Sequence, residues 1–254
     1  MSDHSTHLLL KSNLKQLRLP TISAEFAKLA SEAASANESY EAYLLRLTEL
    51  EVATRGANAL AASIKRARFP VLKDLDTYDF SLMPTLNKPK ILELGRCEWI
   101  EQHGNCCLVG SPGTGKTHLA IALGQAACRR AKRVRFFTAA ELVMRLEEAQ
   151  KQYTLERALS QLARVDLLIC DELGYVSFSQ AGAELLFQVL ADRYERASVL
   201  VTSNLAFGEW NQVFQGERMT AALLDRLTHH CHILDMNGQS YRFRESVKSH
   251  EAAD

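Results

Sequence analysis

The chain is 254 residues long, which is enough for one large domain or for a medium-sized domain with a smaller one attached. Lysine plus arginine and aspartate plus glutamate each total 30, so the net charge is zero with histidine neutral. This balance argues against a strongly basic nucleic-acid-binding protein, and only a local patch of positive charge would bind DNA. The sequence shows no signal peptide, no run of 18 apolar residues and no C-x-x-C pair among its six cysteines. We therefore expect a cytoplasmic protein with no membrane partner.

Residues 1–69 are predicted to form a small all-helical domain. Residues 1–68 contain one glycine, Gly56, and one proline, Pro20, so little interrupts a helix there. Apolar residues recur at helical spacing along three segments. The first helix is expected to end near Leu19–Pro20, the second to span 21–36, and the third to be capped by Asn37 or Ser39 and to end at Phe69–Pro70.

A linker and an α/β domain are predicted to follow. Three prolines and several turn-forming residues predict a linker over 70–90. Over residues 91–254 the pattern alternates between apolar strands and amphipathic helices. Such alternation is typical of an α/β fold with a mostly parallel sheet that is covered on both faces. The expected strands are 105–109, 134–137, 165–170, 198–201 and 232–235, and the expected helices are 118–130, 138–150 and 181–196.

Residues 110–117 match the G-x-x-x-x-G-K-[ST] pattern of a phosphate-binding loop. Glycine allows the backbone to wrap closely, so that its N–H groups point at phosphate oxygens. Lys116 can reach the β- and γ-phosphates, and the hydroxyl of Thr117 can bind the Mg²⁺ that bridges them. An apolar strand before the loop and a helix after it provide the context that an anion site requires. The expected nucleotide-binding residues are Gly110, Ser111, Pro112, Gly113, Thr114, Gly115, Lys116 and Thr117.

An acidic pair after a buried strand predicts the hydrolytic part of the site. Asp171 and Glu172 follow an apolar run that ends at Cys170, about 55 residues after Lys116. We expect Asp171 to hold Mg²⁺ and Glu172 to polarise the water that attacks the γ-phosphate. Taken alone, the same pair would fit an acidic turn in solvent. The complete phosphate-binding loop upstream favours the functional interpretation.

Asn204 and Arg226 are two further candidates for catalysis. Asn204 follows the strand over 198–201, and parallel strands end at one edge of a sheet, so we expect Asn204 beside Glu172, where it can orient water. A plain turn is the alternative. Arg226 lies on an amphipathic helix, where an arginine normally faces solvent, but it also suits an arginine finger that acts on the γ-phosphate of a neighbouring subunit. Arg242 and Arg244 compete for related roles or are plain surface charges.

Two clusters of basic residues are the local patches that would contact DNA. The first places five positive charges within the seven residues from Arg129 to Arg135. Such a run usually lies in solvent at the negative end of a helix dipole, but it also suits a phosphate backbone, and both interpretations stay open. The candidate DNA-binding residues are Arg129, Arg130, Lys132 and Arg133 in the first cluster and Lys65, Arg66 and Arg68 in a weaker second cluster.

Together these motifs resemble those of the IstB-like transposition helper ATPases, which are related to the DnaC helicase loaders within the AAA+ group. The resemblance covers nearly the whole chain. Its most discriminating part is the stretch over 171–175, because helicase loaders tend to continue differently after the first acid. Further matching stretches are 17–20, 40–44 with Glu51, 67–70, 75–80, 110–120, 193–195, 202–204, 209–210, 225–227 and 238–242.

The resemblance implies a bacterial AAA+ ATPase that uses ATP and Mg²⁺, forms a homo-oligomer on duplex DNA with ATP at the subunit interfaces, and assists a partner transposase. Such a protein would be cytoplasmic and would associate with the nucleoid when bound to DNA. The short tail after Arg244 implies a reduced helical lid. Carried over by position, the implied roles are phosphate and Mg²⁺ binding for Lys116 and Thr117, nucleotide contact for His118, metal binding for Asp171, water activation for Glu172, first sensor for Asn204, trans-acting arginine for Arg226 and second sensor for Arg242.

Three other functions fit parts of the pattern. A replicative helicase loader of the DnaC type would share the chemistry and differ in its partner. A small-molecule P-loop kinase would need an acceptor-binding lid, and the long helical leader and Asn204 argue against it. An architectural DNA-binding protein with structural ATP would not need the pair of Asp171 and Glu172.

Overall fold

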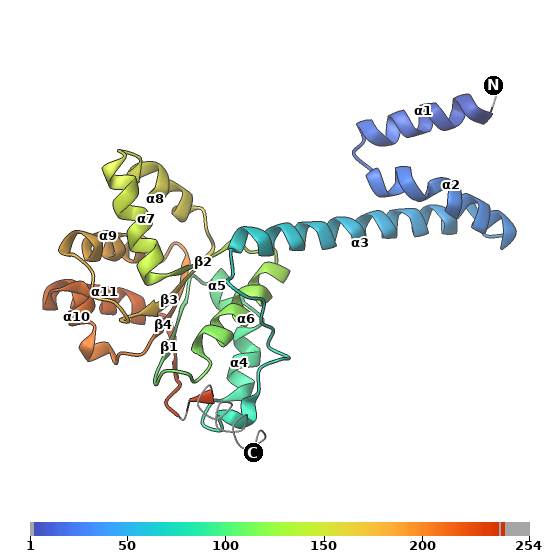
Figure 1. The fold of residues 1–254 in the computed structure, drawn as a ribbon. Coiled ribbons are helices and arrows are strands. Elements are labelled where there is room, and N and C mark those ends of the chain that lie inside the picture. Colours follow the sequence, from blue (N-terminus) through green and yellow to red (C-terminus); the bar gives the residue numbers. More distant parts are fainter. Residues whose placement is uncertain (1–2, 239, 242–254) are drawn as a thin grey trace, which may run out of the picture. The chain divides into compact units, whose positions relative to one another are not determined.

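The chain folds as two compact units, and the computed structural model describes residues 3–238 and 240–241 (Figure 1). The first unit is Met1–Ala62 and the second is Ser63–Asp254. The division falls inside the third helix, a few residues before the domain end that the sequence analysis placed at residue 69. The first unit is built from helices, and the second contains a β-sheet flanked by helices.

The first unit contains α1 (Asp3–Gln16), α2 (Pro20–Ser35) and most of α3 (Tyr40–Ala67). Pro20 lies in the first turn of α2, where its missing N–H costs no hydrogen bond. Of the two predicted caps of α3, Ser39 accepts a hydrogen bond from the backbone N of Ala42 at 3.2 Å, whereas Asn37 adopts a left-handed backbone with φ of 52°. The buried apolar core of this unit contains Leu14, Ile22, Phe26 and Leu47.

Glu51 ties α3 to the beginning of α2. Its buried carboxylate accepts hydrogen bonds from the backbone N–H groups of Thr21 and Ile22, at 2.9 and 3.0 Å. These N–H groups are among the donors that a helix N-terminus leaves without a partner in the helix. A single acidic side chain therefore fixes where α2 begins against α3.

The second unit is built on a five-stranded parallel sheet (Figure 1). The strands lie in the order β2-β3-β4-β1-β5, and every neighbouring pair is parallel. Their carboxyl ends therefore meet at one edge, which is where open α/β sheets bind ligands. The strands are β1 (Asn105–Val109), β2 (Val134–Thr138), β3 (Leu167–Leu173), β4 (Ser198–Ser203) and β5 (Cys231–Asp235).

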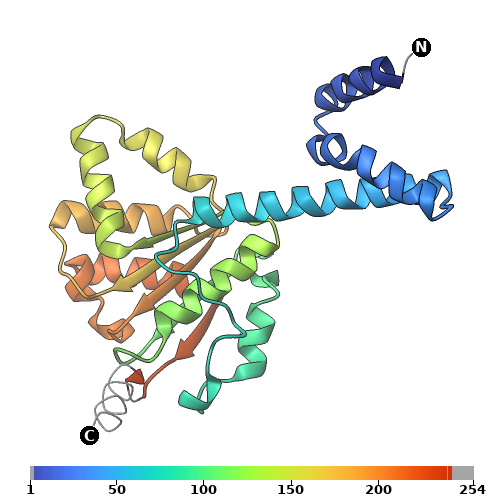
Figure 2. The same ribbon diagram turned by 45° about the vertical axis from the view of Figure 1, so that its right-hand side comes forward.

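Helices cover both faces of this sheet (Figure 2). The helices that follow α3 in the described part of the chain are η1 (Phe80–Leu82), α4 (Lys88–Leu94), α5 (Glu98–Glu101), α6 (Lys116–Arg129), α7 (Ala139–Lys151), α8 (Leu155–Ala163), α9 (Gln180–Ala191), η2 (Phe207–Glu209), α10 (Asn211–Phe214) and α11 (Glu217–Thr228). One face carries α6, and the other carries α7, α9 and α11. No helix in the described part of the chain is long and apolar enough to cross a membrane.

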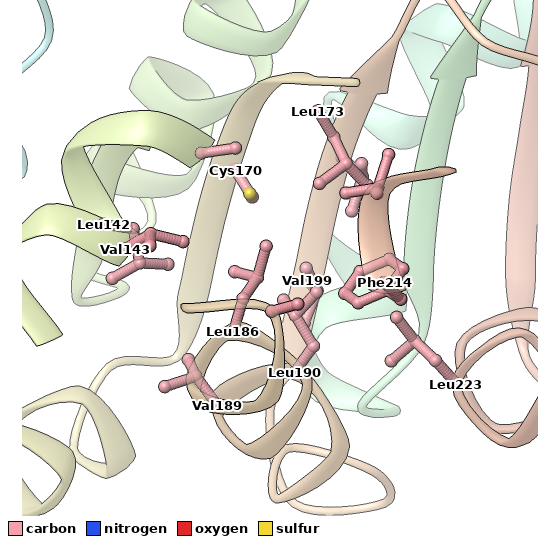
Figure 3. Close-up of a cluster of buried hydrophobic side chains, with 14 of the residues drawn as sticks. Leu142, Val143, Cys170, Leu173, Leu186, Val189, Leu190, Val199, Phe214 and Leu223 are labelled. Atoms are coloured by element: carbon pink, nitrogen blue, oxygen red, sulfur yellow. The ribbon is translucent and has the colours of Figure 1, made fainter. Parts of the chain in front are cut away.

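The larger apolar core lies between the sheet and the layer of α7, α9 and α11 (Figure 3). Leu142 of α7, Leu186 of α9 and Leu223 of α11 pack there against the strands. On the opposite face α6 approaches the sheet closely at Gly124, where a Cβ would lie 2.7 Å from Ile169 Cδ1. This glycine sets how near the helix that follows the phosphate-binding loop lies to β3.

The predicted α/β fold with a mostly parallel sheet is confirmed, and the differences lie at element ends and in helices that were not predicted. The helix expected to reach residue 196 ends at Ala191, because the chain turns there to bury Arg193. The Arg193 guanidinium donates to the carbonyl oxygens of Val165 and Ser198, at 2.8 and 2.9 Å. The region 70–90, expected as a linker, contains η1 and the beginning of α4, and α8 was not predicted.

Candidate functional site

The phosphate-binding loop lies between β1 and α6, at the carboxyl edge of the sheet. Gly110, Gly113 and Gly115 have φ of 148°, 79° and 89°, a region that favours glycine, so the turns of the loop depend on these residues. Lys116 begins α6, and its Nζ donates to the carbonyl oxygens of Gly110 and Ser111, both at 2.7 Å. The loop thus wraps around an ammonium group at a helix N-terminus, an arrangement that binds anions.

Asp171 is a buried acid joined to this loop by hydrogen bonds. Thr117 Oγ1 donates to the Asp171 carboxylate at 3.0 Å, and Thr202 Oγ1 of β4 donates to it at 2.5 Å. Burial raises the pKa of Asp171, the bonds from Thr202 and Thr117 oppose that rise, and the Glu172 charge adds to it. A hydroxyl and a carboxylate this close are oxygen ligands of the kind that Mg²⁺ takes, so the two residues fit the predicted metal site.

Glu172 lies at an irregularity in the ladder between β3 and β4. Their pairing is regular up to Cys170 and resumes with a shifted register at Leu173. Glu172 has a left-handed φ of 61°, and its N–H donates to Thr202 Oγ1 at 2.9 Å. The irregularity leaves Glu172 exposed in the cavity beside the loop while Asp171 stays buried. Strained backbone of this kind is concentrated at functional sites.

A cavity of about 530 Å³ lies over the loop. This volume falls within the range of about 300–1,000 Å³ that is usual for small-molecule sites. Besides the loop, it is lined by Glu172, Thr202 and side chains from two segments that are remote in sequence. These side chains are Val71, Lys73, Thr77, Tyr78, Asp79 and Met83 from the predicted linker, and Tyr241 near the C-terminus.

Residues 71–83, called the linker strap from here on, are attached along α6. Gln125 Nε2 donates to the carbonyl oxygen of Lys73 at 2.7 Å, and Arg129 forms an ion pair with Asp74. These contacts are made by the carboxyl half of α6, away from the loop at its beginning. The linker strap is therefore a fixed wall of the cavity, attached to the same helix that carries Lys116.

Tyr78 of the linker strap contacts the phosphate-binding loop directly. Its hydroxyl lies 3.4 Å from the carbonyl oxygen of Thr114, and its ring lies where a Cβ on Gly115 would come within 3.1 Å. Burial raises the pKa of Tyr78 to about 12. His118, predicted to contact the nucleotide, lines the cavity with its ring edge-on to Tyr78 at 5.2 Å, and burial lowers its pKa.

The segment after β5 folds back onto the loop. Asn237 Oδ1 accepts a hydrogen bond from the backbone N of Ser111 at 3.1 Å. The backbone N of Tyr241 donates to the carbonyl oxygen of Gly113 at 2.9 Å. The loop is therefore held by this segment as well as by α6. The predicted second sensor, Arg242, and its competitor Arg244 lie outside the described residues.

Asn204 lies next to the acidic pair but does not line the cavity. It follows β4 at the point where Ser203 pairs with Leu173 of β3. Its Oδ1 is buried and has no hydrogen-bond partner among the described residues. A buried acceptor without a partner is costly and is found at functional sites more readily than elsewhere.

Arg226 lies away from the cavity of its own chain. Its guanidinium lies 5.9 Å from the ring centroid of Phe187, so it is placed where α11 meets α9. That layer covers the sheet face opposite to α6 (Figure 1). Within the described chain, Arg226 is therefore not brought together with Lys116 and Glu172.

The two basic clusters differ in how their charges are paired. Each candidate in the first cluster is bonded within the second unit, and three of the four are paired with a carboxylate, which leaves less positive charge for a phosphate backbone. The partners are Asp74 for Arg129, the Arg96 carbonyl oxygen for Arg130 (2.8 Å), Glu101 for Lys132 (2.9 Å) and Asp166 for Arg133 (2.5 Å). By contrast Lys65, Arg66 and Arg68 are exposed, and no ion pair between described residues includes them.

Three residues of the site were missed in the sequence analysis. Thr202, which bonds both acids, was visible only as part of a polar cluster at a strand end. Tyr78 lies in the family-like stretch 75–80 but was given no role, and Asn237 belongs to no local pattern, because each meets the loop only through the tertiary fold. The available signals were a threonine at a strand end and the family-like stretch that contains Tyr78.

The fold and the site together define a class of protein. A phosphate-binding loop after β1 and a buried acid on β3 that is hydrogen-bonded to it, on a parallel sheet, form a P-loop nucleotide-binding domain. The same fold occurs in the crystal structure of a DnaC helicase loader, with a TM-score of 0.50, 24% identity, and coverage of 64% of this chain and 96% of that one. It also occurs in the crystal structure of DnaI, with a TM-score of 0.55, 18% identity and coverage of 65% and 90%. At these identities the likeness concerns the fold alone.

Sequence relatives define the family. A family model described as IstB-like ATP binding protein matches residues 12–249. The chain is 38% identical to the ATP-binding protein of insertion sequence IS5376 from Geobacillus stearothermophilus, over 91% of this chain and 92% of the relative. It is 36% identical to the ATP-binding protein of insertion sequence IS21 from Pseudomonas aeruginosa, over 93% of this chain and 89% of the relative. The chain belongs to the IstB-like family of ATP-binding proteins, and the predicted resemblance is confirmed.

Proposed function

We propose that this protein is a magnesium-dependent ATPase that assembles on duplex DNA and helps a transposase to select and use a target site, with hydrolysis releasing the assembly. The observation that carries the proposal is the hydrogen-bonded series from Thr117 through Asp171 to Thr202, with Glu172 in the same cavity. A phosphate-binding loop alone would support nucleotide binding only. The relatives from insertion sequences support the transposition context.

In this proposal the loop and α6 bind the triphosphate. The loop N–H groups and the helix N-terminus receive the phosphate oxygens, and the Lys116 ammonium adds a positive charge that burial keeps poorly hydrated. Thr117 and Asp171 would hold Mg²⁺ through their side-chain oxygens. When bound, Mg²⁺ would supply positive charge against the negative charge of the triphosphate. The linker strap and Tyr241 form the walls beyond the phosphates.

Glu172 acts on the attacking water. Its carboxylate is exposed in the cavity, and its backbone N–H is held by Thr202, so the side chain starts from a fixed position. As a general base it draws a proton from the water as the water approaches the γ-phosphate. Asn204 does not line the cavity in this structure, so in this proposal its buried Oδ1, which lacks a partner among the described residues, turns towards the same water and orients it.

Arg226 completes the site of a neighbouring subunit. It cannot serve its own site from the junction of α9 and α11, so the charge that hydrolysis needs comes from a second copy. Nucleotide at a shared interface stabilises the assembled state, and its loss by hydrolysis removes that stabilisation. ATP is then the switch for assembly on DNA.

Replacement of Glu172 by glutamine tests the proposal. We expect Glu172→Gln to bind ATP like the wild type, to hydrolyse it about 100-fold or more slowly, and to stay on duplex DNA after ATP is added. Hydrolysis is measured by phosphate release and DNA retention by sedimentation. Glu156→Gln, an exposed glutamate on α8, is the matched control and should behave like the wild type. Equal hydrolysis rates for Glu172→Gln and the control would contradict the proposal.

The partner is tested separately. We expect a purified transposase of an IS21-type element to join the protein on duplex DNA in the presence of ATP, and a replicative helicase not to join it. Retention of the helicase instead would favour a loader. Transfer of phosphate to a small-molecule acceptor would favour a kinase.

A further inference from the structure

Within the phosphate-binding loop, the peptide group between Thr114 and Gly115 needs a contact that fixes its orientation. Gly115 has φ of 89°, and glycine adopts either sign of φ at little steric cost, so sterics alone do not set this peptide plane. The preceding peptide is held, because the carbonyl oxygen of Gly113 accepts a hydrogen bond from the backbone N of Tyr241 at 2.9 Å. The Thr114 side chain is held as well, since its Oγ1 donates to the carbonyl oxygen of Ser111 at 2.8 Å. Neither bond holds the carbonyl oxygen of Thr114 itself.

Tyr78 makes the contact that these bonds leave open. Its hydroxyl donates to the carbonyl oxygen of Thr114 at 3.4 Å, which is long for a hydrogen bond. Burial raises the pKa of Tyr78 to about 12, so the hydroxyl keeps its proton and remains a donor at neutral pH. The Tyr78 ring lies beside Gly115, where an added Cβ would come within 3.1 Å of Cε2. One side chain therefore contacts both residues that this peptide joins.

The buried Tyr78 ring is itself held in place by its neighbours. Phe80 meets it edge-to-face with the ring centroids 4.9 Å apart, and His118 of α6 meets it edge-on at 5.2 Å. The linker strap that carries Tyr78 is attached to α6 through Gln125 and Arg129. The hydroxyl therefore reaches the loop from a fixed position.

The orientation of this peptide decides where the Gly115 N–H points. Because a peptide group is planar and trans, its C=O and N–H point to opposite sides of the chain. The Thr114 oxygen points to Tyr78, so the Gly115 N–H points away from Tyr78. No hydrogen bond between described residues uses this N–H. It is a donor at the beginning of α6, and phosphate oxygens bind donors of this kind.

We propose that Tyr78 is a positioning residue of the nucleotide site, whose hydroxyl fixes the Thr114–Gly115 peptide so that the Gly115 N–H faces the phosphates. This inference rests on the proposed function, because it requires the loop to bind a triphosphate. Tyr78 acts through the loop and makes no contact of its own with the nucleotide. Without the hydroxyl, the peptide also takes the opposite orientation, and the apparent affinity falls with the fraction of loops that can bind.

Removal of the hydroxyl alone tests this role. Tyr78→Phe keeps the ring, and Tyr153→Phe, which changes a fully exposed tyrosine outside the cavity, is the matched control. The probes are a non-hydrolysable β,γ-imido analogue of ATP and inorganic tripolyphosphate, each titrated by calorimetry. We expect Tyr78→Phe to weaken binding of both probes about threefold to tenfold, by similar factors because the loop meets only the phosphates. Tyr153→Phe should bind both like the wild type.

Two further measurements separate positioning from a general loss of structure. In steady-state hydrolysis, the KM for ATP of Tyr78→Phe should rise by the same factor while kcat stays unchanged. In the wild-type chain, the Gly115 amide resonance should shift saturably in NMR spectra as tripolyphosphate is added. The same resonance should broaden or split in Tyr78→Phe without ligand, because the peptide then has two orientations.

The outcomes that contradict the inference are distinct from those that contradict the proposed function. Normal binding of both probes by Tyr78→Phe, or a wild-type Gly115 resonance that tripolyphosphate leaves unchanged, would overturn the role of Tyr78 alone. A loss confined to the ATP analogue would overturn it too, since the hydroxyl would then contact the nucleoside. A wild-type chain that binds neither probe would contradict the nucleotide site itself.

Discussion

At the scale of single residues, Thr202 positions both members of the acidic pair, Asp171 and Glu172. Its hydroxyl donates to Asp171 at 2.5 Å and accepts from the N–H of Glu172 at 2.9 Å. The Thr202 side chain thereby holds Asp171 in its buried position. It also fixes the backbone of Glu172 in the conformation that directs the Glu172 side chain outward. The two acids are adjacent in sequence but differ in burial, which suits one for a metal and the other for water.

Asp171 lowers the stability of the fold at neutral pH. Its pKa is raised by burial above the ordinary 3.8, so its carboxyl favours folding below the ordinary value and that contribution is lost as pH rises through the raised pKa. We expect Asp171→Asn to abolish ATP hydrolysis and to raise the free energy of unfolding at pH 7 by about 1 kcal/mol, since the amide removes a buried charge. The gain should shrink as pH falls through the raised pKa, because the wild-type carboxyl then becomes protonated.

Urea unfolding without nucleotide or Mg²⁺, repeated between about pH 4 and 8, measures this difference. Thr117→Val is a useful comparison, because it removes one donor to the same carboxylate and leaves the charge. A variant Asp171→Asn that is less stable than the wild type at pH 7 would mean that the bonds from Thr117 and Thr202 outweigh the effect of burial.

At the scale of elements, the linker strap changes how the first basic cluster is understood. Arg129 was a candidate for DNA contact, but it pairs with Asp74 of the linker strap at the end of α6. Together with Gln125, it attaches a wall of the nucleotide cavity to the helix of the phosphate loop. The contact therefore supports the nucleotide site.

If Arg129 supports the cavity wall, Arg129→Gln should weaken nucleotide binding, and if it contacts DNA, the substitution should weaken DNA binding. We expect nucleotide affinity to fall about threefold to tenfold, because the wall loses one attachment, with duplex DNA affinity and its salt dependence unchanged. Arg66 lies in the second cluster, which is exposed and forms no ion pair with another described residue. Arg66→Gln should therefore reduce the salt dependence of DNA binding by about one counterion and leave nucleotide affinity alone. Fluorescence titrations with a labelled nucleotide and a labelled duplex measure both. A lower salt dependence in Arg129→Gln would restore its role as a DNA contact.

Local patterns predicted the elements well where a single stretch of chain determines the structure. The phosphate-binding loop, the capping of α7 by Thr138 and the acids after β3 are each set by adjacent residues, and all were visible in the sequence. Helix α9 ends early because Arg193 finds partners on β4 and before β3, which no local pattern reveals. The same holds for Tyr78 and Asn237, which reach the loop from remote segments.

At the scale of the whole molecule, one chain assembles only part of the proposed hydrolysis site in its cavity. The loop, the acids and the linker strap meet in one cavity, whereas Arg226 lies on the opposite layer of the same unit. A site that needs the arginine for hydrolysis therefore needs a second copy of the chain. In the proposed function, this requirement links nucleotide binding to assembly, and hydrolysis to release from DNA.

Mixing two inactive variants tests this shared site most directly. Lys116→Ala removes the phosphate-binding ammonium and keeps Arg226, and Arg226→Ala does the reverse. Each should have little ATPase activity alone, whereas an equal mixture on duplex DNA should recover a substantial fraction of the wild-type rate, because some interfaces combine an intact loop with an intact arginine. A mixture that stays as inactive as its components, although both variants assemble on DNA, would contradict a site completed by a neighbouring subunit.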